Sequence, residues 1–140
     1  MIKIKYLRDI EHIKKIEIGN MIDLRCGEDI YLEKGEYRLI PLGVAMELPQ
    51  NFYAQVYPRS STFSKYKIIM ACSVGIIDHA YCGDKDEWFF PAIAMEKTFI
   101  PKGSRICQFR IFEQQPELEF VEVESLNNKN RGGIGSTGEQ

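Results

Sequence analysis

Short apolar segments, each closed by a turn signal, follow one another from residue 21 to residue 112 and constrain the fold more than any other feature. Alternation of apolar and polar residues is typical of strands, and glycine or proline between such segments is typical of tight turns. No long helical period intervenes, so the sequence predicts an all-β sandwich or barrel. The predicted strands are 2–6, 21–26, 29–32, 36–40, 44–48, 52–57, 87–95, 105–112 and 118–123.

Two segments depart from this pattern. Ile10, Ile13 and Ile16 recur at helical spacing among charged residues, which predicts either one short helix or a loop docked on the core. After Pro58 ends a strand, Ser60 or Ser61 can cap a short helix whose N-terminus would bind an anion. The other interpretation of this second segment is a capped turn with a solvated arginine.

Length and charge limit the class of protein. The chain has 140 residues, with 18 basic against 20 acidic side chains, which favours one domain and argues against a duplex nucleic-acid partner. No apolar run approaches the roughly 18 residues of a membrane span, and the N-terminus lacks the apolar stretch of a signal peptide. We therefore expect a cytoplasmic protein that binds neither nucleic acid nor a membrane.

The four cysteines form no Cys-x-x-Cys pair, so the spacing of a zinc site is absent. In a protein without an export signal they are expected to be reduced thiols. Cys26 and Cys107 are predicted to be small buried hydrophobic residues.

Residues 75–83 place Asp78 between a β-branched run and Tyr81, with glycine at both ends. This pattern predicts a tight hairpin that holds one carboxylate and one ring, and such a carboxylate is a candidate general base. The alternative is a surface turn whose aspartate hydrogen-bonds its own backbone.

The C-terminal segment is rich in glycine and carries Arg131, with four glycines in the seven residues 132–138. Such a segment cannot pack a core, but its backbone N–H groups and its arginine could close over anionic oxygens. Simple disorder is the alternative. The sequence thus predicts a β domain at 1–126 and a C-terminal arm at 127–140.

Together, an acid in a hairpin, an Arg-Ser-Ser turn, a glutamine on a strand, an early aspartate and a glycine-rich arm suit metal-assisted attack of water on a phosphoryl group. Five motifs in this order resemble those of the trimeric dUTPase family. The Trp88–Pro91 run and the short C-terminal motif resemble its branch from Gram-positive bacteria and their phages. The five motifs span residues 23–25, 58–61, 75–83, 103–108 and 131–138.

The resemblance implies a jelly-roll protomer with one short helix, in a homotrimer whose active sites are shared between subunits. It implies Mg²⁺-assisted hydrolysis of dUTP to dUMP and pyrophosphate, which removes dUTP from the nucleotide pool and supplies dUMP. Asp78 would activate the water that attacks the α-phosphorus, and Asp23 would act on the metal through water.

The same resemblance implies the substrate contacts. Tyr81 would lie under the deoxyribose, and the backbone of Ile76 and Ile77 would pair with the uracil edge. The residues that would hold the phosphates are Arg59, Ser60, Ser61 and Gln108, with Arg131, Ser136 and Thr137 closing over the β and γ phosphates.

Several positions depart from the family pattern. Cys72 stands where many members have an asparagine near the base, and Cys82 stands where a basic residue is common. Ile134 replaces the phenylalanine that stacks on uracil, so Phe89 is the candidate ring, with core burial as its other interpretation. Lys129 is the alternative to Arg131 as a phosphate ligand.

Two competing functions remain at this point. A dCTP deaminase-like enzyme shares the implied fold, although such proteins carry a glutamate in the corresponding hairpin. A phage-type regulatory protein would keep the fold and bind a protein partner.

Overall fold

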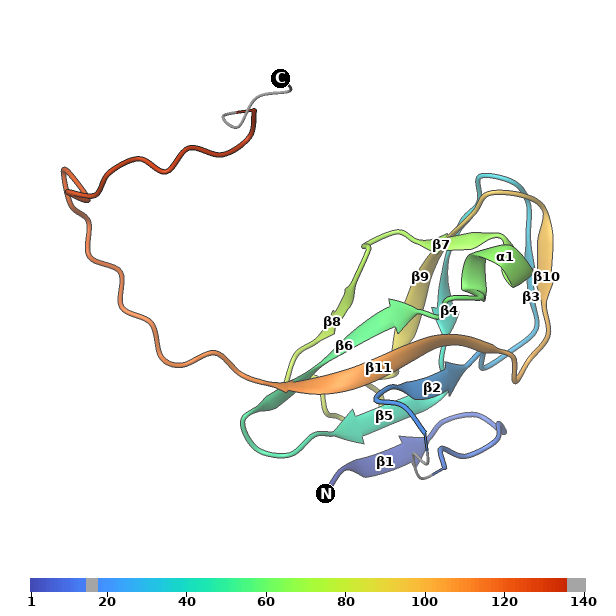
Figure 1. Ribbon diagram of the computed structural model, residues 1–140. Coiled ribbons are helices and arrows are strands. Elements are labelled where there is room, and N and C mark those ends of the chain that lie inside the picture. Colours follow the sequence, from blue (N-terminus) through green and yellow to red (C-terminus); the bar gives the residue numbers. More distant parts are fainter. Residues whose placement is uncertain (15–17, 136–140) are drawn as a thin grey trace.

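The computed structural model describes residues 1–14 and 18–135, which form a β protein with one short helix (Figure 1). Eleven strands are assigned in this part of the chain. Their bounds are β1 Lys3–Tyr6, β2 Ile22–Arg25, β3 Ile30–Leu32, β4 Tyr37–Pro41, β5 Val44–Glu47, β6 Phe52–Pro58, β7 Ile68–Met70, β8 Gly75–Ile77, β9 Phe89–Ala94, β10 Thr98–Ile100 and β11 Arg105–Glu113, and the helix α1 is Thr62–Tyr66.

The strands form a jelly roll, and all pairs of neighbouring strands in the described residues are antiparallel. The larger sheet has the order β2-β11-β6-β8, and a three-stranded sheet has the order β4-β9-β7. Two further pairs, β1 with β5 and β10 with β3, complete the body. The predicted all-β fold class is therefore confirmed, and the larger sheet is the element that positions the site.

The core lies between the sheets and is built around aromatic side chains. Trp88 and Phe109 meet edge to face with ring centroids 5.2 Å apart, and Phe90 is fully buried beside them in the same cluster. Burial of each such ring stabilises the fold by roughly 1.5–3 kcal/mol relative to exposure. The apolar run 87–95 thus forms the buried strand that its composition predicts.

The N-terminal segment after β1 is a docked loop in its described part. Residues 7–14 contain no helix, and Ile13 packs against the core while its backbone N–H donates to the hydroxyl of Tyr6 at 2.7 Å. Of the two interpretations of the isoleucine spacing, the loop is correct for these residues. Ile16 lies outside the described residues.

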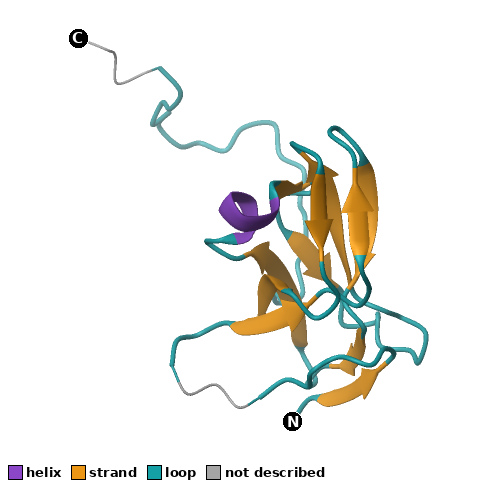
Figure 2. Cartoon of the chain, turned by 90° about the vertical axis from the view of Figure 1, so that its right-hand side faces the viewer, coloured by secondary structure: helices purple, strands orange, loops and turns teal. Residues whose placement is uncertain are grey.

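One strand prediction is wrong. Residues 118–123 form no strand, and Figures 1 and 2 show this segment as loop that leaves the body after β11. Its apolar side chains are exposed, Phe120 at 88%, because no strand of the same protomer lies beside it. An alternating sequence specifies a strand only where a partner supplies the hydrogen bonds.

The strand predicted at 105–112 is confirmed as β11, but its buried and exposed side chains do not alternate cleanly at its start. A β-bulge between Arg105 and Cys107 shifts the register against β2, and Ile106 and Cys107 are therefore both fully buried. A bulge inserts one extra residue into a strand and re-aims the side chains around it.

The body ends with β11 at Glu113, and the segment that follows is exposed. The division at residue 126 stays a prediction. No helix in the described ranges is long and apolar enough to cross a membrane.

Candidate active site

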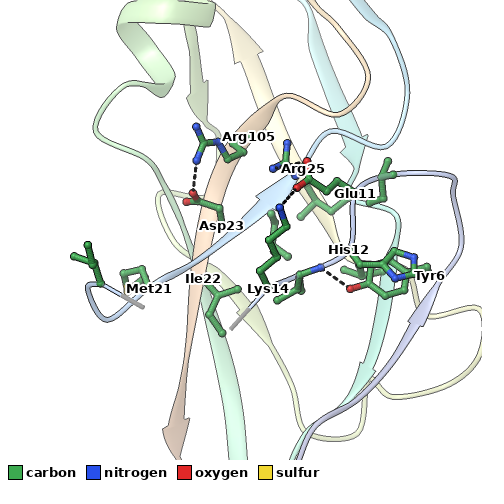
Figure 3. Close-up of a pocket in the computed structure, with 15 residues that line it drawn as sticks. Tyr6, Glu11, His12, Lys14, Met21, Ile22, Asp23, Arg25 and Arg105 are labelled. Carbon is green, nitrogen blue, oxygen red and sulfur yellow. Dashed lines mark hydrogen bonds and ion pairs between the residues drawn. The ribbon is translucent and has the colours of Figure 1, made fainter. Parts of the chain in front are cut away.

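The β2 edge of the larger sheet gathers arginines around Asp23. Its Oδ1 lies 3.0 Å from Nε of Arg59, and its Oδ2 lies 3.5 Å from an NH group of Arg105 (Figure 3 draws the second pair). Gln108 lies opposite Asp23 in the β2–β11 register and donates to the carbonyl of Pro58 at 3.1 Å. The structure thus brings together three of the predicted site residues, and adds Arg105, which the residue-by-residue prediction did not include.

The turn between β6 and α1 is fixed by Thr62, which sequence reasoning missed. The Thr62 hydroxyl accepts a hydrogen bond from the backbone N–H of Arg59 at 2.8 Å and donates to the carbonyl of Ile106 at 2.7 Å. Among the residues that the structure describes, Thr62 is the one polar residue that is buried, with 1% of its surface exposed. A threonine three residues after an arginine in a turn is the signal that could have identified this anchor.

The expected capping of the helix by a serine is wrong in its detail. Ser61 occupies the N-cap position, but its side chain makes no capping hydrogen bond. The helix has only five residues, so it contributes little dipole, and any anion binding here would come from Arg59 and the two serine hydroxyls. Ser60 is exposed and Ser61 is half-buried, so both hydroxyls are near solvent.

A cavity of about 310 Å³ lies between this edge and the N-terminal loop (Figure 3). Glu11 crosses its rim, with its carboxylate 3.1 Å from Arg25 and 2.8 Å from Lys14. The hydrogen bond from Lys14, followed by the charge of Arg25, lowers the pKa of Glu11. This loop closes the cavity from one side, and the spacing of Glu11 and Lys14 three residues apart is the sequence signal for their ion pair.

Asp78 lies at the opposite end of the same sheet, in an exposed turn directly after β8. Its Oδ1 accepts a hydrogen bond from the backbone N–H of Ala80 at 2.8 Å, and its carbonyl accepts from the N–H of Tyr81 at 3.0 Å. This is the local bonding of an aspartate turn, and not a two-stranded hairpin, because β8 pairs with β6 instead. A cavity of about 590 Å³, lined by Tyr53, Ile76 and His79 among others, adjoins the carboxylate.

Tyr81 follows in the same loop, and its hydroxyl donates to the carbonyl of Glu87 at 2.7 Å. Partial burial is the main cause that raises the pKa of Tyr81, and the nearby charges of Asp86 and Glu87 add to it. Cys72 and Cys82 are exposed thiols in the turns on either side of Asp78. Phe89 is half-buried at the start of β9, opposite Pro41.

One side of the backbone of β8 is available for a ligand. β8 is the last strand in the sheet order, paired only with β6, through Ile76 opposite Gln55 and Ile77 opposite Ala54. The outer side of an edge strand presents unpaired N–H and C=O groups. Ile76 is also 60% exposed, so a planar group could approach this edge.

The two groups of site residues lie apart within one protomer. β2 and β8 are the first and fourth strands of the sheet, so three strand spacings, about 14 Å, separate them. Within residues 1–14 and 18–135, no hydrogen bond or ion pair joins Asp78 to Arg59, Gln108 or Asp23. The chain thus presents a basic edge, defined by Asp23, Arg59, Arg105 and Gln108, and an acid edge, defined by Ile76, Ile77, Asp78 and Tyr81.

The arm carries the remaining predicted residues. Lys129 and Arg131 are exposed, and Ile134 has no contact that shields it from solvent. Ser136 and Thr137 lie outside the described residues. The chain leaves the body after Gln114, before residue 127, the predicted start of the arm, and the N–H of Gln114 donates to the carbonyl of Asn51 at 2.8 Å.

Comparison with known proteins gives consistent matches along the whole chain. A family model described as dUTPase matches residues 20–138. A prophage-derived deoxyuridine 5'-triphosphate nucleotidohydrolase of Bacillus subtilis is 53% identical over 98% of this chain and 97% of its own length.

Solved structures agree with the fold. A dUTPase of Staphylococcus bacteriophage 80alpha, solved with dUpNHpp, has a TM-score of 0.78 at 22% identity and covers 99% of this chain and 98% of its own. A dUTPase from phage phi11 of S. aureus, described with a structural Mg(II) ion, has a TM-score of 0.76 at 18% identity, over 89% of this chain and 98% of its own.

Proposed function

The chain belongs to the dUTPase family and is a dUTP nucleotidohydrolase, and we propose that Asp78 is the general base of its reaction. In this mechanism Asp78 takes a proton from a water molecule, the water oxygen attacks the α-phosphorus, and pyrophosphate leaves to give dUMP. The observation that carries the proposal is the exposed carboxylate in the turn after β8, beside a cavity of about 590 Å³.

The geometry of Asp78 suits a base. One carboxylate oxygen is occupied by the N–H of Ala80 at 2.8 Å, which fixes the orientation of the group. The second oxygen has no recorded partner among the residues that the structure describes, so it is available to water. A base oriented through one oxygen and open at the other typically contributes 10² to 10⁴ in rate, the usual range for general base catalysis.

The nucleoside would bind along the acid edge. Uracil would pair with the outer backbone of β8 at Ile76 and Ile77, as an added strand would. The ring of Tyr81, held by its hydroxyl at the carbonyl of Glu87, would lie under the deoxyribose and leave no room for a 2′-hydroxyl. Phe89 would cover the uracil face, and Cys72, in the turn before β8, would lie near the base and the attacking water.

The phosphates would bind at the basic edge. Arg59 is paired with Asp23 in the protomer, and phosphate oxygens would replace that carboxylate as its partner. The amide of Gln108 and the hydroxyls of Ser60 and Ser61 would donate further hydrogen bonds. Donors that are already in place when charge develops on the phosphate are often the largest catalytic contribution.

Mg²⁺ would bind at this edge mainly through the phosphates of the substrate. In the described ranges no three histidine, cysteine or acidic side chains form a metal-binding group, so the protein alone offers no cage. Mg²⁺ commonly keeps its waters and binds through substrate phosphates with one or two carboxylates. Asp23, released by Arg59, would hold a metal-bound water, and the ion would supply charge neutralisation at the phosphates.

A homotrimer would unite the two edges. The basic and acid edges are about 14 Å apart by strand spacing in one protomer, so the acid edge of one subunit would meet the basic edge of another. The outer face of the sheet supports such a contact. There Tyr53 and Phe112 lie with ring centroids 5.9 Å apart beside exposed Ile76, the aromatic and apolar composition that is typical of protein interfaces.

The arm would complete the site. The described part of the segment after β11 runs away from the body (Figure 1), so Arg131 could reach a neighbouring subunit. Arg131, with Ser136 and Thr137 of the same motif, would close over the β and γ phosphates. Lys129, two residues before Arg131, is the alternative cation. Division of the chain into a β domain and an arm at residue 126, and a cytoplasmic location, stay predictions.

Incubation of the purified protein with dUTP or dCTP and Mg²⁺ tests the reaction. The expected products from dUTP are dUMP and pyrophosphate, with dCTP unchanged. Release of ammonia from dCTP would contradict the assignment and favour the deaminase.

A regulatory role with a protein partner has its own test. If Asp78→Asn abolishes hydrolysis and leaves a cellular phenotype unchanged, then binding is the main role.

A further inference from the structure

The loop that carries Tyr81 is anchored to the body by a partly buried ion pair between Arg8 and Glu87. Nε of Arg8 donates to Oε2 of Glu87 at 2.8 Å, and a second guanidinium nitrogen donates to Oε1 at 3.2 Å. The Glu87 side chain is 12% exposed and also accepts the N–H of Gly43 at 2.9 Å. A fork of two parallel hydrogen bonds fixes orientation as well as position.

The body is shaped to admit the Arg8 side chain. A Cβ atom on Gly27 would lie 2.5 Å from Cδ of Arg8, and one on Gly43 would lie 3.3 Å from its Cβ. Gly43 also has a φ of +72°, which favours glycine at this position. The N–H of Leu7 donates to the carbonyl of Gly43 at 2.8 Å, so the backbone beside Arg8 is fixed as well. Two glycines therefore line a slot that the arginine fills on its way to Glu87.

Glu87 connects this slot to the acid edge. Its backbone carbonyl accepts the hydrogen bond of the Tyr81 hydroxyl at 2.7 Å. Between the two residues, the loop is closed by the carboxylate of Asp86, which accepts the N–H of Gly83 at 2.8 Å. The next residue, Trp88, is buried and its N–H donates to the carbonyl of Val44 at 2.9 Å. The residue whose carbonyl binds the Tyr81 hydroxyl is therefore itself fixed through its side chain by Arg8 and Gly43, and the residue after it is fixed by Val44.

We propose that Arg8 and Glu87 are positioning residues for Tyr81, and that they set how strongly the enzyme prefers 2′-deoxyribose over ribose in a uridine triphosphate. This inference rests on the proposed role of Tyr81 beneath the sugar. A ring excludes a 2′-hydroxyl only if it cannot retreat, because a displacement of about 1 Å opens room for one oxygen. Loss of the anchor lets the ring retreat, so ribose is accepted while deoxyribose still binds.

The readout is the ratio of kcat/KM for dUTP to kcat/KM for UTP. In Glu87→Gln and in Arg8→Met, this ratio should fall about tenfold. Most of the change should come from a higher kcat/KM for UTP. Arg8→Lys keeps the charge but loses the fork, so it should restore part of the ratio.

Two controls separate positioning from general loss of structure. Glu47→Gln removes the ion pair between Lys3 and Glu47, 3.2 Å long, which also ties β1 to the body. It leaves the Arg8–Glu87 fork and the Tyr81–Glu87 hydrogen bond in place, so it should leave the ratio unchanged. Tyr81→Phe removes the hydroxyl. In that background, Glu87→Gln should cause almost no further change, because the two residues act through one hydrogen bond.

Hydrogen exchange of residues 79–87 reports the anchor without substrate, and protection there should fall in Glu87→Gln and not in Glu47→Gln. An unchanged sugar ratio in folded Glu87→Gln overturns the inference, as does an effect that adds fully to that of Tyr81→Phe. If the wild-type protein does not hydrolyse dUTP, the proposed function fails, and the exchange measurement alone then decides whether Glu87 anchors the loop.

Discussion

The two edges of the larger sheet carry opposite chemistry, although both derive from the same four strands. At the basic edge, the carboxylate of Asp23 lies between Arg59 and Arg105, at 3.0 and 3.5 Å. At the acid edge, Asp78 has a backbone N–H as its partner at 2.8 Å, and in the described part of the chain no basic side chain pairs with it. Under the proposed function, one protomer would therefore carry the phosphate-binding groups and the base at separate edges.

The cysteines follow the same division. Cys26, directly after β2, and Cys107, in β11, are buried, whereas Cys72 and Cys82 beside the acid edge are exposed. Burial raises the pKa of Cys26 to about 11, and it raises the pKa of Cys107 as well. The two cysteines near the basic edge thus lie in the packed body, whereas Asp78 and Tyr81 of the acid edge lie in an exposed loop after β8, to which Glu87 is hydrogen-bonded.

Removal of the acid has the largest expected effect. Asp78→Asn should lower kcat about 10³-fold, within the usual range for general base catalysis, with the fold intact. The measurement is pyrophosphate release from dUTP, with circular dichroism to check folding. Asp84→Asn in the same loop is the matched control, since Asp84 is exposed and lies 3.7 Å from Lys5. Its kcat should stay within about twofold of the wild-type value. A tenfold loss or less in Asp78→Asn would remove Asp78 as the base.

Mixing subunits tests directly whether the two edges meet between protomers. Asp78→Asn and Arg59→Ala should each be nearly inactive alone. In randomly mixed trimers, about a quarter of the sites would combine an intact acid edge with an intact basic edge from another subunit, so activity should return to that level. Native mass spectrometry confirms the mixing. Mixed trimers without any recovery would show that each site uses both edges of one protomer.

Deletion of the arm should have a smaller effect than loss of the base. A chain that ends at Leu126 should lose about 10² in kcat/KM, the cost of removing phosphate donors. The fold should persist, because Lys129 and Arg131 lie exposed and outside the core. Steady-state kinetics and analytical ultracentrifugation test both statements, and unchanged kinetics would reject the closing role of the arm.

Alkaline pH should lower the free energy of unfolding through Cys26, which directly follows β2. The folded-state pKa of Cys26 rises from 9.0 to about 11, so the folded protein holds the thiol proton more tightly than the unfolded chain. This stability is fully present below pH 9 and is lost as the pH rises towards 11, by about 3 kcal/mol for two pKa units. Urea unfolding at pH 8 and pH 11 measures this loss. Between the two pH values, the free energy of unfolding should fall less in Cys26→Ala than in wild type, and in Cys72→Ala, where the thiol is exposed, it should fall as much as in wild type.

Substitution of Phe89, the ring proposed to cover uracil, has the smallest expected effect. Phe89→Leu should raise KM for dUTP about fivefold, in line with about 1 kcal/mol for an aromatic contact. Phe99→Leu is the control, since Phe99 is an exposed aromatic that stacks on Tyr31, with centroids 4.4 Å apart, away from either edge. Equal KM values for wild type and Phe89→Leu would assign Phe89 to packing alone.

Much of the body could be predicted from residue types, because strand period and turn residues are local signals. The strand that contains Phe90 and the turn that contains Asp78 follow from the sequence in this way. The bulge at Ile106 could not be predicted, since it depends on how β11 meets β2. The segment around Phe120 was assigned to a strand because alternation alone does not reveal whether a partner is present.

The sequence by itself determined the family, the all-β class and the types of residue that could bind and hydrolyse a nucleotide, because these depend on short motifs and their order. Only the tertiary structure decided that Asp23 and Asp78 stand at opposite edges of one sheet, and that Glu87 joins Arg8 to the hydroxyl of Tyr81. The physical reason is that strand order and long-range hydrogen bonds arise from packing between residues far apart in the chain, which no local pattern records.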